Sequence, residues 1–133
     1  MSVVDAYISW SEGRFFIHTP SDVGVSVMGK TVSEAKRLFE EFVSEYRSDC
    51  IEAGASVPEE LRGDYAISYN YEMSALLQEL PVTLRALSQV TGLNQRQLSA
   101  YKNGLKTPRK ATGEKILHGI KEIGNTLQSV TLR

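Results

Sequence analysis

The residues best suited to chemistry lie in one stretch near the C-terminus, GLNQRQLSAYKNGLKTPRK, from Gly92 to Lys110. Amide and guanidinium side chains come first, and cations follow them. A glutamine amide can form two hydrogen bonds with adenine, and an arginine can form two with guanine, at base edges in the DNA major groove. The predicted base-reading residues are Gln95, Arg96, Gln97 and Ser99.

Polar and basic residues on either side of this group suit the DNA backbone. Lysine and arginine neutralise phosphates, and short polar side chains hydrogen-bond the phosphate oxygens. The predicted phosphate-binding residues are Thr83, Asn94, Lys102, Lys106, Thr107, Arg109 and Lys110. We therefore interpret the stretch as a site where amides read the DNA sequence and cations hold the backbone.

Two short helices joined by a glycine turn would present these side chains. Thr83 is a good N-cap for a helix that ends at Gly92, because glycine takes the left-handed conformation that a tight turn needs. Asn94 can cap the next helix, with Gln97 at capping-box spacing, and Gly104 ends it. This order predicts a helix-turn-helix arrangement, in which the first residues of the second helix meet base edges.

Further helices would flank this pair and bury its inner face. Leu98 and Tyr101 fall on one side of the second helix, three residues apart. A short helix before the pair ends at Pro81, and Pro108 precedes a last helix. The apolar stripe of the last helix consists of Ile116, Ile120, Ile123 and Leu127.

The first half of the chain favours a sheet covered by one helix. Apolar and polar residues alternate over 3–10, 23–29 and 65–71, and residues 14–19 are β-branched and aromatic, which predicts four strands. Thr31 and Glu34 have capping-box spacing at the start of a helix. Its apolar stripe consists of Ala35, Leu38, Phe39, Phe42, Val43 and Tyr46. Residues 51–63 predict a loop. The expected fold class is α+β, with a β-β-β-α-β domain followed by an all-α domain.

The net charge of −1 over 133 residues hides a difference between the two halves. Residues 1–72 contain six Lys and Arg against 13 Asp and Glu, a net charge of −7. Residues 73–133 contain nine against three, a net charge of +6, which favours binding to a polyanion. The split predicts two domains with different partners, at residues 1–72 and 73–133.

Composition favours a folded, cytoplasmic protein that does not bind a membrane. No apolar run approaches the length of a membrane span, and the N-terminus lacks the order of a signal peptide. The single cysteine, Cys50, cannot form an internal disulfide, which suits a reducing compartment. His18 and His118 lack neighbouring zinc ligands, and we expect no metal or cofactor.

The helical half resembles the Cro/phage-repressor class of helix-turn-helix domains, from about Met73 to Leu127. The spacings that carry the resemblance run from a small residue four before the turn glycine to a glycine and a proline after the second helix. In this sequence they are Ser88, Gly92, Asn94, Gln95, Leu98, Ser99, Gly104 and Pro108. The resemblance implies binding to double-stranded operator DNA as a homodimer or a higher homo-oligomer.

The first half resembles the HicB antitoxin family over about Asp5 to Phe42, through the stretch PSDVGVSVMGKTVSEAKRLFEEFV. The matching residues are Pro20, Gly29, Thr31, Glu34 and Ala35. The resemblance implies a partial ribonuclease-H-like domain and repression of the protein's own operon. It also implies a protein partner, for which a HicA-like toxin is the candidate.

Two other functions stay open at the level of the sequence. The helical half could be a docking bundle that binds protein and not DNA. A ribonuclease-H-like domain could be a weak ribonuclease, but metal-dependent cleavage needs carboxylates that converge, and Asp5, Glu12 and Asp22 are scattered. We therefore expect no enzyme activity. Three tyrosines could stack RNA bases, although burial preferences favour packing beneath the helix. They are Tyr65, Tyr69 and Tyr71.

Overall fold

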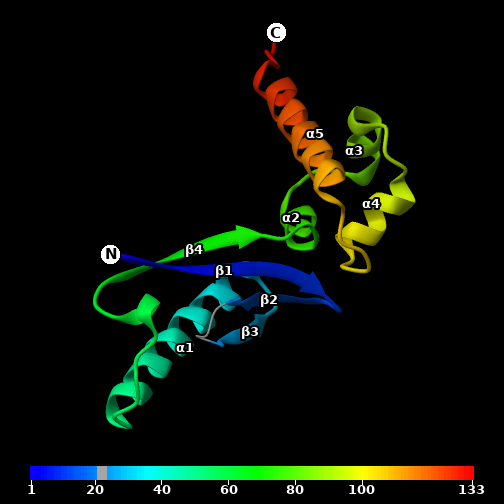
Figure 1. Ribbon diagram of the computed structural model, residues 1–133. Helices are drawn as coiled ribbons and strands as arrows, with labels where there is room; N and C mark the ends of the chain where they lie inside the picture. The colour runs from blue at the N-terminus through cyan, green and yellow to red at the C-terminus, as the bar shows by residue number, and fades with distance from the viewer. Residues whose placement is uncertain (21–23) are drawn as a thin grey trace.

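The computed structural model describes residues 1–20 and 24–133, and it shows strands in the first half of the chain followed by helices (Figure 1). The strands are β1 (Ser2–Ser11), β2 (Arg14–His18), β3 (Ser26–Gly29) and β4 (Tyr65–Tyr71). The helices are α1 (Val32–Glu52), the 3-10 turn η1 (Glu59–Leu61), α2 (Met73–Glu79), α3 (Leu84–Thr91), α4 (Gln95–Lys102) and α5 (Lys110–Gln128). The predicted α+β class is confirmed.

The four strands form one mixed sheet in the order β3-β2-β1-β4. Strands β1 and β2 form an antiparallel hairpin, and β3 pairs antiparallel with β2. The chain then crosses through α1, so that β4 runs parallel to β1 and pairs with it from Ser2↔Tyr65 to Ile8↔Tyr71. Of the third predicted strand, residues 23–29, β3 forms the part from Ser26 onward, the prediction is wrong for Gly24 and Val25, and Val23 lies outside the described residues.

One face of the sheet is covered by α1, and the core lies between them (Figure 1). Val4, Ala6 and Ile8 point to this side from β1 and meet Phe39 and Val43 of α1, and all five are almost wholly buried. The alternation that predicted β1 is therefore confirmed. The predicted apolar stripe of α1 is wrong at one position. The side chain of Phe42 is 50% exposed, because it lies at the rim of the sheet.

The predicted loop over residues 51–63 is confirmed for 53–58 and 62–63, and it is wrong for the end of α1 and for the 3-10 turn η1. Helix α1 continues to Glu52, and Gly54 ends it with a φ of 68°. The Ala55 N–H bonds the Cys50 carbonyl and the Gly54 N–H bonds the Ile51 carbonyl, which is a Schellman motif. The glycine that suggested a loop is thus the C′ residue of a longer helix. Later in the segment, Leu61 of η1 is fully buried in the core.

Two tyrosines of β4 pack beneath α1. The Tyr69 ring meets Phe39 edge to face, and its hydroxyl donates to the Glu40 carboxylate at 2.8 Å. Burial, followed by the hydrogen bond to Glu40, raises the pKa of the Tyr69 hydroxyl well above its usual range. Tyr65 also packs against the core, whereas Tyr71 is exposed at the strand end. The packing interpretation is confirmed for Tyr65 and Tyr69.

A second core joins the four helices after β4. It consists of Leu77, Leu87, Leu98, Tyr101 and Ile116, one or two residues from each of α2 to α5. This core fixes the positions of α3 and α4 relative to the helices on either side. Among the described residues, no helix combines the length and the apolar character that crossing a membrane requires.

Candidate nucleic-acid interface

Helices α3 and α4 form a closely joined helix pair. Helix α3 begins after Thr83, whose hydroxyl accepts from the Ala86 N–H, and ends at Gly92, which has a φ of 75°. The Ser88 hydroxyl donates to the Leu93 carbonyl at 2.6 Å, which ties the turn back to α3. Helix α4 begins after Asn94, whose side chain accepts from the Arg96 N–H at 2.7 Å. Both predicted N-caps are confirmed, and only residues 92–94 separate the two helices.

The inner side of α4 is buried, which determines the side that faces solvent. Leu98 and Tyr101 pack in the helical core, as predicted. Gln95 and Arg96 are exposed in the first turn of α4. Side chains in this position can contact a ligand or macromolecule that approaches the helix N-terminus, where the unpaired N–H groups also favour anions.

The other two predicted base-reading residues are hydrogen-bonded to side chains of α4 or of its C-cap residue. The Gln97 amide donates to the Tyr101 hydroxyl at 2.8 Å, and the Asn94 side chain accepts from the Arg96 N–H and not from Gln97. The expected capping box between Asn94 and Gln97 is therefore wrong, and Asn94 caps the helix alone. The reason is that residues i and i+4 lie on the same side of a helix, which brings the phenol within reach of the amide. The half-buried Ser99 hydroxyl accepts from the Asn103 amide at 3.2 Å.

The predicted phosphate-binding residues fall into two groups. Asn94 and Lys106 line a hollow of about 450 Å³ beside α4, together with Arg96 and Gln97 of the base-reading set. The remaining residues lie elsewhere: Thr83 caps α3, Lys102 is half-buried at the end of α4, Thr107 lies in the loop, and Arg109 and Lys110 are exposed where α5 begins. The structure therefore brings Lys106 next to the first turn of α4, although eight residues lie between it and Gln97 in the sequence.

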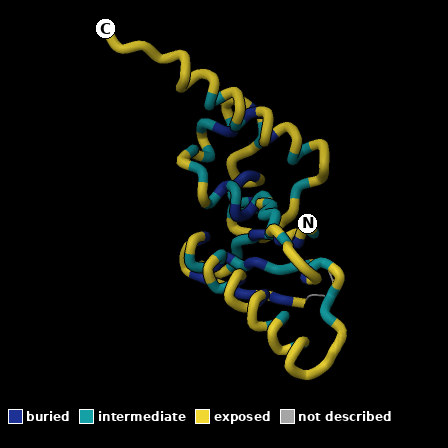
Figure 2. The backbone as a smooth tube through the Cα atoms, turned by 90° about the vertical axis from the view of Figure 1, so that its left-hand side faces the viewer, coloured by how far each residue is buried: buried dark blue, intermediate teal, exposed yellow. Residues whose placement is uncertain are grey.

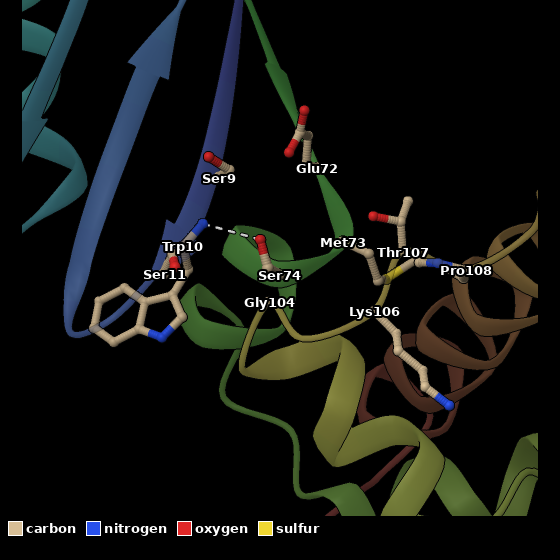
Figure 3. Close-up of a pocket in the computed structure, with 10 residues that line it drawn as sticks. All are labelled: Ser9, Trp10, Ser11, Glu72, Met73, Ser74, Gly104, Lys106, Thr107 and Pro108. Carbon is tan, nitrogen blue, oxygen red and sulfur yellow. Dashed lines mark hydrogen bonds between the residues drawn. The ribbon is translucent and has the colours of Figure 1, made fainter.

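The end of α4 also rests on the end of β1, a contact that the sequence analysis did not predict (Figure 3). The Trp10 N–H donates to the Ser74 hydroxyl at 2.9 Å, which ties β1 to α2. The Gln78 amide donates to the Lys102 carbonyl at 3.2 Å, which ties α2 to α4. A Cβ atom on Gly104 would overlap the Trp10 carbonyl oxygen, so the backbones approach too closely for any other residue. We call these contacts the junction.

A small polar cavity of about 210 Å³ lies at the junction (Figure 3). Glu72 lines it from the strand side and Lys106 from the helical side. Lys106 thus lies between the junction and the hollow beside α4. No sequence signal marks Ser74 or Gln78 for these roles, since each depends on a partner 24 or more positions away.

The carboxylates considered for a metal-dependent nuclease do not converge. Asp5 is exposed on β1, and Glu12 lies in the turn seven residues further on, roughly 20 Å along an extended chain. Asp22 lies outside the described residues. Within residues 1–20 and 24–133, no group of three His, Cys, Asp or Glu side chains is placed to hold a metal ion.

Comparisons with protein-family models, with curated proteins and with solved structures found no match to this chain. The geometry and charge of the helix pair are therefore the support for a functional proposal.

Proposed function

We propose that the protein is a transcriptional regulator that binds operator DNA through the helix pair. The observation that carries the proposal is the exposure of Gln95 and Arg96 in the first turn of a helix whose opposite side is buried. A helix presented in this way can enter the major groove with its N-terminal side chains on base edges. The Lys106 side chain beside this turn and the net charge of +6 over residues 73–133 support contacts with phosphates.

The residues of the two predicted sets take separate parts in this proposal. Gln95 and Arg96 read bases directly. Gln97 joins them after exchanging its bond to Tyr101 for one to a base, and Ser99 contributes its hydroxyl. Lys106, Arg109 and Lys110 hold phosphates, since all three are exposed. Because one helix reads few base pairs, two chains would bind half-sites about one DNA turn apart.

The sheet and α1 would bind a protein partner, as the resemblance to HicB antitoxins implies. A hollow between α1 and the start of β3 supports this assignment, since it combines the half-exposed Phe42 ring with the carboxylates of Glu45 and Asp49. An apolar anchor with an acidic rim suits a basic protein, and a HicA-like toxin is such a candidate. The net charge of −7 over residues 1–72 would speed the encounter.

Replacing Gln95 by Ala is expected to weaken operator binding by roughly 1–3 kcal/mol, because a bidentate contact to a base is lost. The measurement is fluorescence anisotropy against DNA from upstream of the protein's own gene, with scrambled DNA of the same composition as the reference. Gln89→Ala is the matched control, since Gln89 is also an exposed glutamine and lies on α3.

The proposal requires that Gln95→Ala lose affinity for the operator and keep its affinity for scrambled DNA, while Gln89→Ala changes neither. Equal losses on both DNAs would assign Gln95 to the backbone and not to the bases. Wild-type protein that binds neither DNA above background would leave the helix pair as a protein-docking bundle.

A further inference from the structure

The apolar stripe of α5 is covered at one end and bare at the other. Ile116 is fully buried, and Ile120 and Ile123 are half-buried against the helical core. Further along the same stripe, the side chain of Leu127 is 67% exposed. The cause is a difference in length, because α3 has eight residues, about 12 Å, whereas α5 has 19, about 28 Å. The stripe therefore continues after the helix that covers it has ended.

The bare end of α5 projects away from the rest of the molecule. Figures 1 and 2 show the C-terminal turns of α5 leading away from the sheet, and Figure 2 shows exposed residues up to the terminus. Two further apolar side chains follow α5: Val130 and Leu132 are 65% and 97% exposed. An apolar surface of this kind on a projecting helix is typical of an interface.

The charge of this surface favours a second copy over a strongly charged partner. Between Leu117 and Val130 the chain has one Lys and one Glu, Lys121 and Glu122, so the surface is close to neutral. Apolar side chains are also exposed on the open face of the sheet, at Val3 and Met28. That face belongs to the half with a net charge of −7, so two copies would repel each other there.

We propose that the last three turns of α5 and the following tail bind the same segment of a second copy, with the two helices antiparallel about a two-fold axis. In this arrangement each copy covers the other's Leu127. The inference of this contact depends on the apolar stripe of α5 and not on DNA binding. Its use, which is to place two helix pairs on two half-sites, rests on the proposed function.

Sedimentation equilibrium of the full chain, without DNA, tests the contact. At micromolar concentration we expect a mass about twice the 14.8 kDa of one chain. Leu127→Glu and Val130→Glu should each weaken the dimer by about a hundredfold or more, because a two-fold contact loses each buried side chain twice. Neither substitution should disturb folding, since both side chains are exposed within one copy, and thermal unfolding would verify this.

Two exposed apolar residues provide matched controls. Leu105 lies in the loop after α4 and is 78% exposed, and Met28 on the open sheet face is 58% exposed. Leu105→Glu and Met28→Glu should both remain dimers. The inference is overturned by a wild-type chain that stays at 14.8 kDa, or by a dimer that survives Leu127→Glu and Val130→Glu. Dissociation of the dimer by Met28→Glu would instead assign the interface to the open face of the sheet. A dimer that fails to bind DNA would reject the proposed function and keep this contact.

Discussion

Gly104→Ala is expected to lower the free energy of unfolding by about 2–4 kcal/mol, more than any other glycine substitution near the helix pair. Two costs combine at this position. Gly104 has a φ of 73°, which an L-residue adopts only with strain. A Cβ atom would also overlap the Trp10 carbonyl oxygen, a backbone atom held within β1. Either α4 or β1 must therefore move, and the junction opens.

Gly54→Ala separates the two costs. Gly54 ends α1 as Gly104 ends α4, each in a Schellman motif and with a similar φ, but a Cβ atom on Gly54 meets no atom within 4 Å. Urea unfolding should give a loss of roughly 1 kcal/mol for Gly54→Ala, and the excess at Gly104 measures the junction. Equal losses for the two variants would mean that the backbone of Trp10 yields freely, and that the junction does not hold α4 in place.

Raising the salt concentration from 50 to 200 mM is expected to weaken operator binding on the order of a thousandfold. The reason is that each phosphate neutralised by a cation releases counterions, and five or six such contacts give a loss of about three decades. The candidate cations are Lys106, Arg109 and Lys110 of each chain, which makes six in a complex of two chains. Anisotropy titrations at four or more salt concentrations would give the slope of the logarithm of the binding constant against the logarithm of the salt concentration. A binding constant nearly independent of salt would contradict a DNA interface and favour an apolar docking surface.

The contribution of Lys106 can be isolated within the same experiment. Lys106→Ala should make the slope shallower by about one per chain and weaken operator and scrambled DNA alike. Lys30→Ala is the control, because Lys30 is an exposed lysine on the strand side of the molecule. If both variants shift the slope equally, the effect comes from net charge and not from a contact at Lys106.

Local patterns predicted most of the elements, because the forces that set them act within a few residues. Alternation at Val4, Ala6 and Ile8 predicted the inner face of β1, and Thr83 and Asn94 capped the helices that they were expected to cap. The end of α1 was missed because a glycine after a helix and a glycine in a loop look alike in sequence.

The contacts that assemble the elements were not predictable in the same way. The parallel pairing of β4 with β1 joins residues about 63 positions apart, and the Trp10–Ser74 bond joins residues 64 apart. Neither leaves a periodic signal, since its partner can be any segment that the fold brings near. The turning of Gln97 toward Tyr101 is local, but two competing partners were in reach and the sequence does not rank them.

The junction also determines how many ways the two halves of the chain can be oriented. Glu72 alone lies between β4 and α2, and its N–H bonds the Ile8 carbonyl at 2.8 Å, so the strand ladder continues up to the first helix of the second half. A flexible tether would let each half search space separately and average over many orientations. In the proposed function, a protein partner bound to the sheet and α1 would therefore keep one orientation relative to the DNA axis, and its size alone would decide whether it collides with the chain on the neighbouring half-site.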